Sequence, residues 1–226
     1  MSEALYQVAT ALVPLVIAIV FHEVAHGWVA RYFGDPTAGQ LGRLSFNPIR
    51  HVDPFGTVIL PMALKLAGVP VFGWAKPVPV DKRRLRNPRL HMIFVALAGP
   101  GMNFLLAALT FLALGGLIAA FGQNPGAPIT FVNDNLVNFA IINVMLGVFN
   151  LIPLPPFDGG HVVEGLLPPA LGRRYARLAR YGFPLMILLI VVLPMLSPKA
   201  AIVPQLIGPP VEWILGLGTR FLSLFG

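Results

Sequence analysis

The sequence predicts an all-α polytopic membrane protein of about five to six transmembrane helices, with a re-entrant or interfacial segment and short strands after the first helix. Hydrophobic residues make up 56% of the 226-residue chain and charged residues only 11%, whereas soluble domains carry about 25% charged residues. The mean hydropathy is +0.77. Long apolar runs also alternate with short polar stretches. A soluble protein of this composition would lack the charged surface that keeps it in water.

Five apolar runs approach the length of about 20 residues that one helical crossing requires. They cover residues 8–30, 92–121, 136–152, 181–196 and 201–219. A sixth run, 55–68, is short for a crossing and contains Pro61 and Lys65, which favours a re-entrant or interfacial segment. The segments 40–54 and 70–80 are rich in Gly, Pro and alternating apolar residues, and this pattern predicts short strands or turns.

The basic residues indicate how the chain is oriented. Ten of the sixteen Lys and Arg residues lie between Arg31 and Arg89, and four more lie between Arg173 and Arg180. If residues 55–68 do not cross the membrane, all fourteen are on one side, which the positive-inside rule assigns to the cytoplasm. The N-terminus is then outside and the C-terminus cytoplasmic. The net charge of +7 is therefore interpreted as membrane topology, and no nucleic acid partner is expected.

The chain is expected to form one integral-membrane domain over residues 1–226. Its core covers about 8–165, and C-terminal helices cover 173–226. No basic residue precedes the first apolar run, so the N-terminus lacks the start of a signal peptide and is expected to begin the mature first helix.

A cluster of ionisable residues, HEVAH at 22–26, interrupts the first apolar run. His22 and His26 are four residues apart, so a helix places them on one face, where they can bind one zinc ion, and Glu23 beside them can act as a general base. The chain has no cysteine, which excludes disulfides and a thiolate site and leaves His, Asp and Glu as metal ligands. Ionisable groups at membrane depth are costly and usually functional. The alternative is a chance match in an amphipathic helix.

A catalytic zinc site needs a third protein ligand, and Asp158 is the candidate. It follows three prolines, which cannot continue a helix, and precedes two glycines, which allow an unusual turn. Such broken backbone at membrane depth is tolerated where it is buried in protein or lines a water-filled cavity. The alternative is that Asp158 caps a helix or stabilises a turn.

Polar residues on two later helices suggest further contacts. Asn143 and Asn150 are seven residues apart and nearly in line on one helix face, and a bond between helices is the favoured interpretation of Asn143. Gly99 and Asn103 share a face of the 92–121 helix. For this pair, close packing with one hydrogen bond and a role in shaping the site both remain open.

Three blocks together resemble the site-2 protease family of intramembrane zinc metalloproteases, peptidase family M50: HEVAH at 22–26, AGPGMN at 98–103 and NLIPLPPFDGG at 150–160. The resemblance implies that His22, His26 and Asp158 bind one zinc ion. It also implies that Glu23 activates water and that Asn150 positions the substrate or polarises its carbonyl group. The stretch FGWAKPVPV is similar to a segment of a compact prokaryotic subgroup without an appended PDZ or CBS domain, and this similarity implies a location in a prokaryotic plasma membrane.

The resemblance implies an intramembrane zinc endopeptidase that hydrolyses peptide bonds within or near transmembrane segments of other proteins. Its partners would be a transmembrane protein substrate and the lipid bilayer. The alternative is a membrane metal-ion transporter or metal-binding protein. A transporter should place ionisable ligands along several spans, but residues 181–196 and 201–211 contain no His, Asp or Glu. Transport also gives no role to Glu23.

Overall fold

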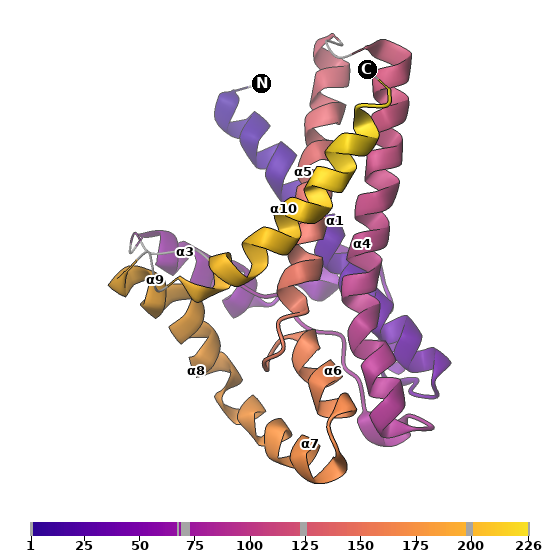
Figure 1. Cartoon of the computed structure of the whole chain (residues 1–226), viewed down its shortest axis with the longest axis vertical. Coiled ribbons are helices and arrows are strands. Elements are labelled where there is room, and N and C mark those ends of the chain that lie inside the picture. The colour runs from indigo at the N-terminus through magenta and orange to yellow at the C-terminus, as the bar shows by residue number, and fades with distance from the viewer. Residues whose placement is uncertain (1, 67, 69–72, 123–125, 198–200, 226) are drawn as a thin grey trace.

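The structure, a computed structural model, describes residues 2–66, 68, 73–122, 126–197 and 201–225. Three long helices form its centre: α1 (Glu3–Tyr32), α4 (Pro88–Phe121) and α5 (Ala127–Asn150) (Figure 1). Each of the three packs against the other two. Their contact faces carry small buried residues such as Ala18, Ala96, Ala107 and Ala140, which allow the close helix approach typical of membrane bundles.

Shorter elements connect and surround these three helices. The first group comprises α2 (Thr37–Gln40), a 3₁₀ helix at Pro48–His51, a π-helical turn at Pro54–Ile59, α3 (Leu60–Leu66) and a 3₁₀ helix at Lys82–Arg84. The second group comprises α6 (Asp158–Leu166), α7 (Pro169–Ala176), a 3₁₀ helix at Arg177–Tyr181, α8 (Gly182–Ile187), a π-helical turn at Leu188–Val192, α9 (Leu193–Leu196) and α10 (Ile202–Leu222).

The prediction of short strands is wrong, because the described ranges contain only helices, turns and extended connections. Within 40–54, Asn47 caps the 3₁₀ helix by accepting a hydrogen bond from the N–H of Ile49. Part of the second predicted strand, 70–72, lies outside the described residues.

Residues 73–80 are extended but do not pair with a neighbouring strand. Their N–H groups bond in different directions: Trp74 donates to Gly56, Lys76 to His51, and Val78 to the side chain of Glu23. Pro77 and Pro79 have no N–H group to donate, so a regular ladder cannot form. Alternating apolar residues therefore resemble a strand here without forming one.

Four helical stretches within the described residues are long and apolar enough to cross a membrane, which is fewer than the five to six predicted. They are Leu5–Tyr32, Pro88–Phe121, Pro128–Asn150 and Pro169–Leu196, the last of which runs continuously from α7 to α9. The chain is thus a multi-pass membrane protein. The predicted last crossing, 201–219, forms α10, whose apolar sequence is interrupted by Pro209, Pro210 and Glu212. The predicted re-entrant segment forms the π-helical turn and α3, a helix too short to be counted as a span.

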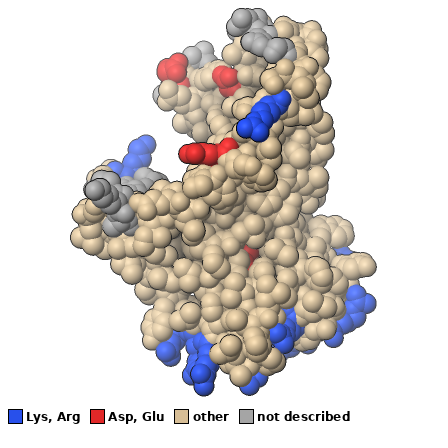
Figure 2. Space-filling model, in the orientation of Figure 1, with Lys and Arg blue, Asp and Glu red and all other residues tan. Residues whose placement is uncertain are grey.

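Most of the basic side chains lie at one end of the molecule. In Figure 2 most of the visible Lys and Arg gather at the lower end, where α7 lies in Figure 1, and the visible Asp and Glu lie mainly above them. Both chain termini lie at the opposite, upper end (Figure 1). The Tyr6 hydroxyl there donates to Asp134, and the Phe225 ring lies against Gly115 near the end of α4. In Figure 1, α10 rises from the level of α9 to this upper end.

Candidate metal centre

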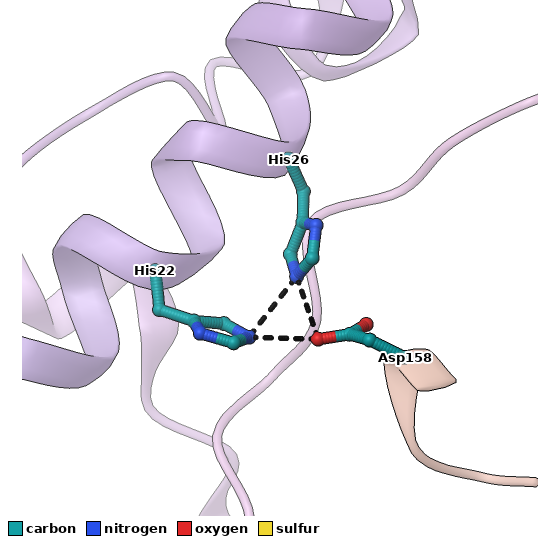
Figure 3. A group of neighbouring side chains, drawn as sticks. All are labelled: His22, His26 and Asp158. Atoms are coloured by element: carbon teal, nitrogen blue, oxygen red, sulfur yellow. Dashed lines mark hydrogen bonds and ion pairs between the residues drawn. The ribbon is translucent and has the colours of Figure 1, made fainter. Parts of the chain in front are cut away.

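Three potential ligand atoms converge between α1 and the start of α6 (Figure 3). Nε2 of His22 lies 3.0 Å from Nε2 of His26 and 3.2 Å from Oδ2 of Asp158, and Nε2 of His26 lies 3.4 Å from the same oxygen. In a tetrahedral zinc site with bonds of about 2.0–2.1 Å, neighbouring ligand atoms are about 3.3 Å apart. The three atoms are therefore spaced like three corners of such a site.

The carboxylate of Asp158 provides a second test of the fit. Its Oδ2 is buried and receives no hydrogen bond from any residue that the structure describes. A buried anionic oxygen without a donor is costly. A cation between this oxygen and the two imidazole nitrogens would remove that penalty, so the donor set suits zinc.

The turn after α5 brings Asp158 to the histidines. Helix α5 ends at Asn150, and the proline-rich segment reverses the chain so that α6 begins at Asp158 itself and packs against α4. The turn is tight at the following glycines: a Cβ at Gly159 would lie 2.5 Å from the carbonyl oxygen of Ile152, and one at Gly160 would lie 2.8 Å from the nitrogen of Pro155. The two glycines therefore allow the close packing that places Asp158.

The other nitrogen of each imidazole faces an oxygen. Nδ1 of His26 lies 2.7 Å from the carbonyl oxygen of Val95, and Nδ1 of His22 lies 2.6 Å from Oδ1 of Asn103. Because a carbonyl oxygen only accepts hydrogen bonds, the Nδ1 of His26 carries the proton and its Nε2 keeps a free lone pair. This is the tautomer that binds a metal through Nε2.

Glu23 and Asn150 line the same cavity as the three ligand candidates, a space of about 720 Å³. Oε2 of Glu23 accepts a 2.7 Å hydrogen bond from the backbone N–H of Val78, and Nδ2 of Asn150 donates to the carbonyl oxygen of Leu146. All five site residues selected from the sequence therefore surround one cavity. Its apolar wall includes Trp74, Phe149, Phe157, Phe183 and Met186.

A charged group that was not selected from the sequence lies beside this cavity. Nζ of Lys82 is 2.9 Å from Oε2 of Glu164, and Lys82 and His161 line both the main cavity and a neighbouring one of about 240 Å³. Burial would raise the pKa of Glu164, but its hydrogen bond with Lys82 holds that pKa below its usual value. Burial lowers the pKa of His161, and the charge of Lys82 adds to the effect. In the sequence, Lys82 is indistinguishable from its basic neighbours.

The model of the family described as peptidase family M50 matches residues 10–132 and 113–193. A Bacillus subtilis protein named "Putative zinc metalloprotease YwhC" is 40% identical over 181 residues, which cover 80% of this chain and 79% of that protein.

More distant relatives have similar names. A protein of Mycolicibacterium smegmatis named "Putative zinc metalloprotease Rip2" is 28% identical over 176 residues, which cover 77% of this chain and 64% of that protein. The protein of the same name from Mycobacterium tuberculosis strain H37Rv is 30% identical over 174 residues, or 76% and 63% of the two chains. The chain thus spans slightly less than two thirds of each Rip2 protein. No solved structure matches it.

Proposed function

This chain belongs to peptidase family M50, and we propose that it hydrolyses peptide bonds within or next to the transmembrane segments of other proteins. It is a zinc metallopeptidase of the site-2 protease type and a multi-pass membrane protein.

The observation that carries the proposal is that His22, His26 and Asp158 converge in a cavity that also contains Glu23, among apolar helices long enough to cross a membrane. We assign the three converging residues as the zinc ligands. Burying such groups among apolar helices is costly, and a substrate bond that itself lies in the membrane provides a reason for it.

A zinc ion at this position would polarise the scissile carbonyl group and lower the pKa of a bound water towards about 7. Glu23 then acts as the general base, which takes a proton from the attacking water and gives it to the leaving amine. Its contact with Val78 fixes one carboxylate oxygen and leaves the other available for this transfer. Asn150, on the cavity wall, is assigned to hydrogen-bond the substrate and orient its carbonyl group.

The substrate is proposed to be a transmembrane segment of another protein that unwinds locally. A peptide bond within a helix is shielded by its own turns, so an extended stretch must enter the cavity before it can be cut. The aromatic wall formed by Trp74, Phe149, Phe157 and Phe183 suits apolar side chains of such a segment. The lipid bilayer is therefore both the solvent of the enzyme and the source of its substrate.

The orientation follows from the charges. The end that carries most Lys and Arg is assigned to the cytoplasm of a prokaryotic cell, which places the N-terminus outside. Because the C-terminus lies at the same end as the N-terminus (Figure 1), it is assigned to the outside as well, in place of the cytoplasmic location expected from the sequence.

The test measures zinc content and cleavage of a panel of single-span membrane proteins by the wild type and by Glu23→Gln, purified in parallel. We expect both proteins to retain zinc and only the wild type to cut, because the variant keeps the ligands and loses the base. Equal cutting by the two proteins would contradict the role of Glu23. Metal flux across liposomes without any cutting would instead support a transporter.

A further inference from the structure

A continuous line of hydrogen bonds crosses the three central helices and ends at a proposed zinc ligand. Nδ1 of His22 on α1 lies 2.6 Å from Oδ1 of Asn103 on α4. Nδ2 of Asn103 donates to Oδ1 of Asn143 on α5 at 2.8 Å. Nδ2 of Asn143 donates in turn to the carbonyl oxygen of Phe139 at 2.8 Å.

We infer that Asn143 is a positioning residue for zinc, which acts through Asn103 to keep the proton of His22 on Nδ1 and the lone pair of Nε2 free for the metal. The inference rests on the proposed role of His22 as a ligand. From the sequence, Asn143 was expected only to form a bond between helices. Here this bond to Asn103 also orients a proposed zinc ligand.

The direction of each bond follows from backbone carbonyl groups, which only accept hydrogen bonds. The carbonyl oxygen of Phe139 requires the amide nitrogen of Asn143 to face it, so Oδ1 of Asn143 points towards Asn103. This oxygen also only accepts, and Asn103 must therefore present its Nδ2. The carbonyl oxygen of Ala18, 3.4 Å from the same Nδ2, favours the same orientation.

With its nitrogen committed to these two acceptors, Asn103 presents only Oδ1 to His22. The Nδ1 of His22 must then be the donor, which leaves the proton off Nε2. The opposite tautomer would place two acceptors 2.6 Å apart and put a proton where the metal binds. Both asparagines are 0% exposed, so neither is in contact with bulk solvent in the folded protein.

The two histidines are therefore oriented in different ways. A backbone carbonyl oxygen, that of Val95, receives the proton of His26 directly. His22 has no such carbonyl contact at Nδ1 among the described hydrogen bonds and depends on two side chains. Substitutions of these two side chains can consequently disturb the orientation of His22 without changing the contact that orients His26. Removal of a partner behind a metal-binding histidine typically weakens metal affinity about 10- to 100-fold.

The experiment measures the zinc dissociation constant of the detergent-purified full chain by competition with a chromophoric chelator. The variants are Asn103→Ala, Asn143→Ala and the double variant, with Thr110→Val as the matched control. Thr110 is also buried on α4, and its hydroxyl donates to the carbonyl oxygen of Leu106, away from the site. We expect each asparagine variant to bind zinc about 10-fold more weakly, and the control to bind it like the wild type.

The double variant separates positioning from packing. If Asn143 acts only through Asn103, the double variant should bind zinc no more weakly than Asn103→Ala. An unchanged dissociation constant in Asn143→Ala, or losses that multiply in the double variant, would overturn the inference. If Asn143→Ala fails to fold, Asn143→Leu tests the same loss with no cavity. His22→Ala distinguishes the two proposals: if it binds zinc like the wild type, the proposed metal site itself is wrong.

Discussion

Gly99 on α4 faces the two histidines so closely that a methyl group at its position would overlap Nε2 of His26 and lie 2.5 Å from Nε2 of His22. The backbone of α4 at Gly99 therefore borders the proposed zinc site. For this glycine the sequence left close packing and a role in shaping the site open, and we propose the second, because the contacts are with the proposed ligand nitrogens.

Gly99→Ala should therefore lower zinc affinity and proteolytic activity by at least about 10-fold, because the methyl group must displace the ligand nitrogens. The control is Gly101→Ala, two residues along the same helix, where an added Cβ meets no atom within 4 Å. Zinc content and activity are measured for both. Equal behaviour of the two variants would contradict the proposed position of the metal.

The backbone N–H of Val78 should contribute to catalysis through Glu23. Pro77 and Pro79 have no N–H, so Val78 is the only donor in this three-residue stretch, and it bonds to Oε2 of Glu23. We expect Val78→Pro to lower kcat by about 100-fold through misplacement of the base, with zinc content and KM unchanged. Val78→Ala keeps the N–H and should lose much less. A rise in KM alone would indicate that Val78 contacts the substrate instead.

The Lys82–Glu164 pair should stabilise the protein only where Glu164 is ionised. Since its pKa is lowered in the folded protein, the stabilisation is present above the pKa of the unfolded state and is lost as the pH falls through the folded pKa. The side chains are 39% and 28% exposed, so solvent screening limits the contribution to less than about 1 kcal/mol.

Lys82→Met should accordingly lower the thermal unfolding midpoint slightly at neutral pH, and the difference from the wild type should shrink in acid. The measurement is thermal unfolding in detergent across that pH range. A difference that stays constant with pH would mean that Lys82 contributes by packing and not by its charge.

Removal of the metal should destabilise the protein as well as inactivate it. A ligand that binds only the folded state adds about 2.7 kcal/mol at a free concentration 100 times its dissociation constant. Chelator-treated protein should thus unfold at a lower temperature and recover when zinc is added. Asp158→Asn, which lacks the carboxylate that binds a cation, should show little recovery. Full recovery by this variant would place the metal elsewhere.

Much of this protein could be predicted from its sequence. The apolar runs predicted a multi-pass membrane protein, and the four-residue spacing of His22 and His26 placed both side chains on one helix face, because helical geometry is local. The prolines and glycines around Asp158 predicted the end of a helix and an unusual turn, since their effect on the backbone does not depend on distant residues.

The strands and the number of spans could not be predicted in this way. Alternating residues in 73–80 resemble a strand, but none of the residues that the structure describes forms a partner strand beside them, and strand pairing depends on the tertiary fold. The sequence shows that Pro209, Pro210 and Glu212 interrupt the apolar run of α10. It does not show that α10 extends towards the end of the molecule that holds the N-terminus.

The sequence by itself determined the kind of chemistry: two histidines, a glutamate and an aspartate without any cysteine, in a chain made for the membrane. Only the tertiary structure decided which atoms support that chemistry. The carbonyl oxygen of Val95, the N–H of Val78 and the Asn103–Asn143 pair are brought to the site by helix packing. Every residue has a backbone carbonyl group, and every residue except proline has a backbone N–H. Only the three-dimensional contacts therefore identify the backbone groups that support the site.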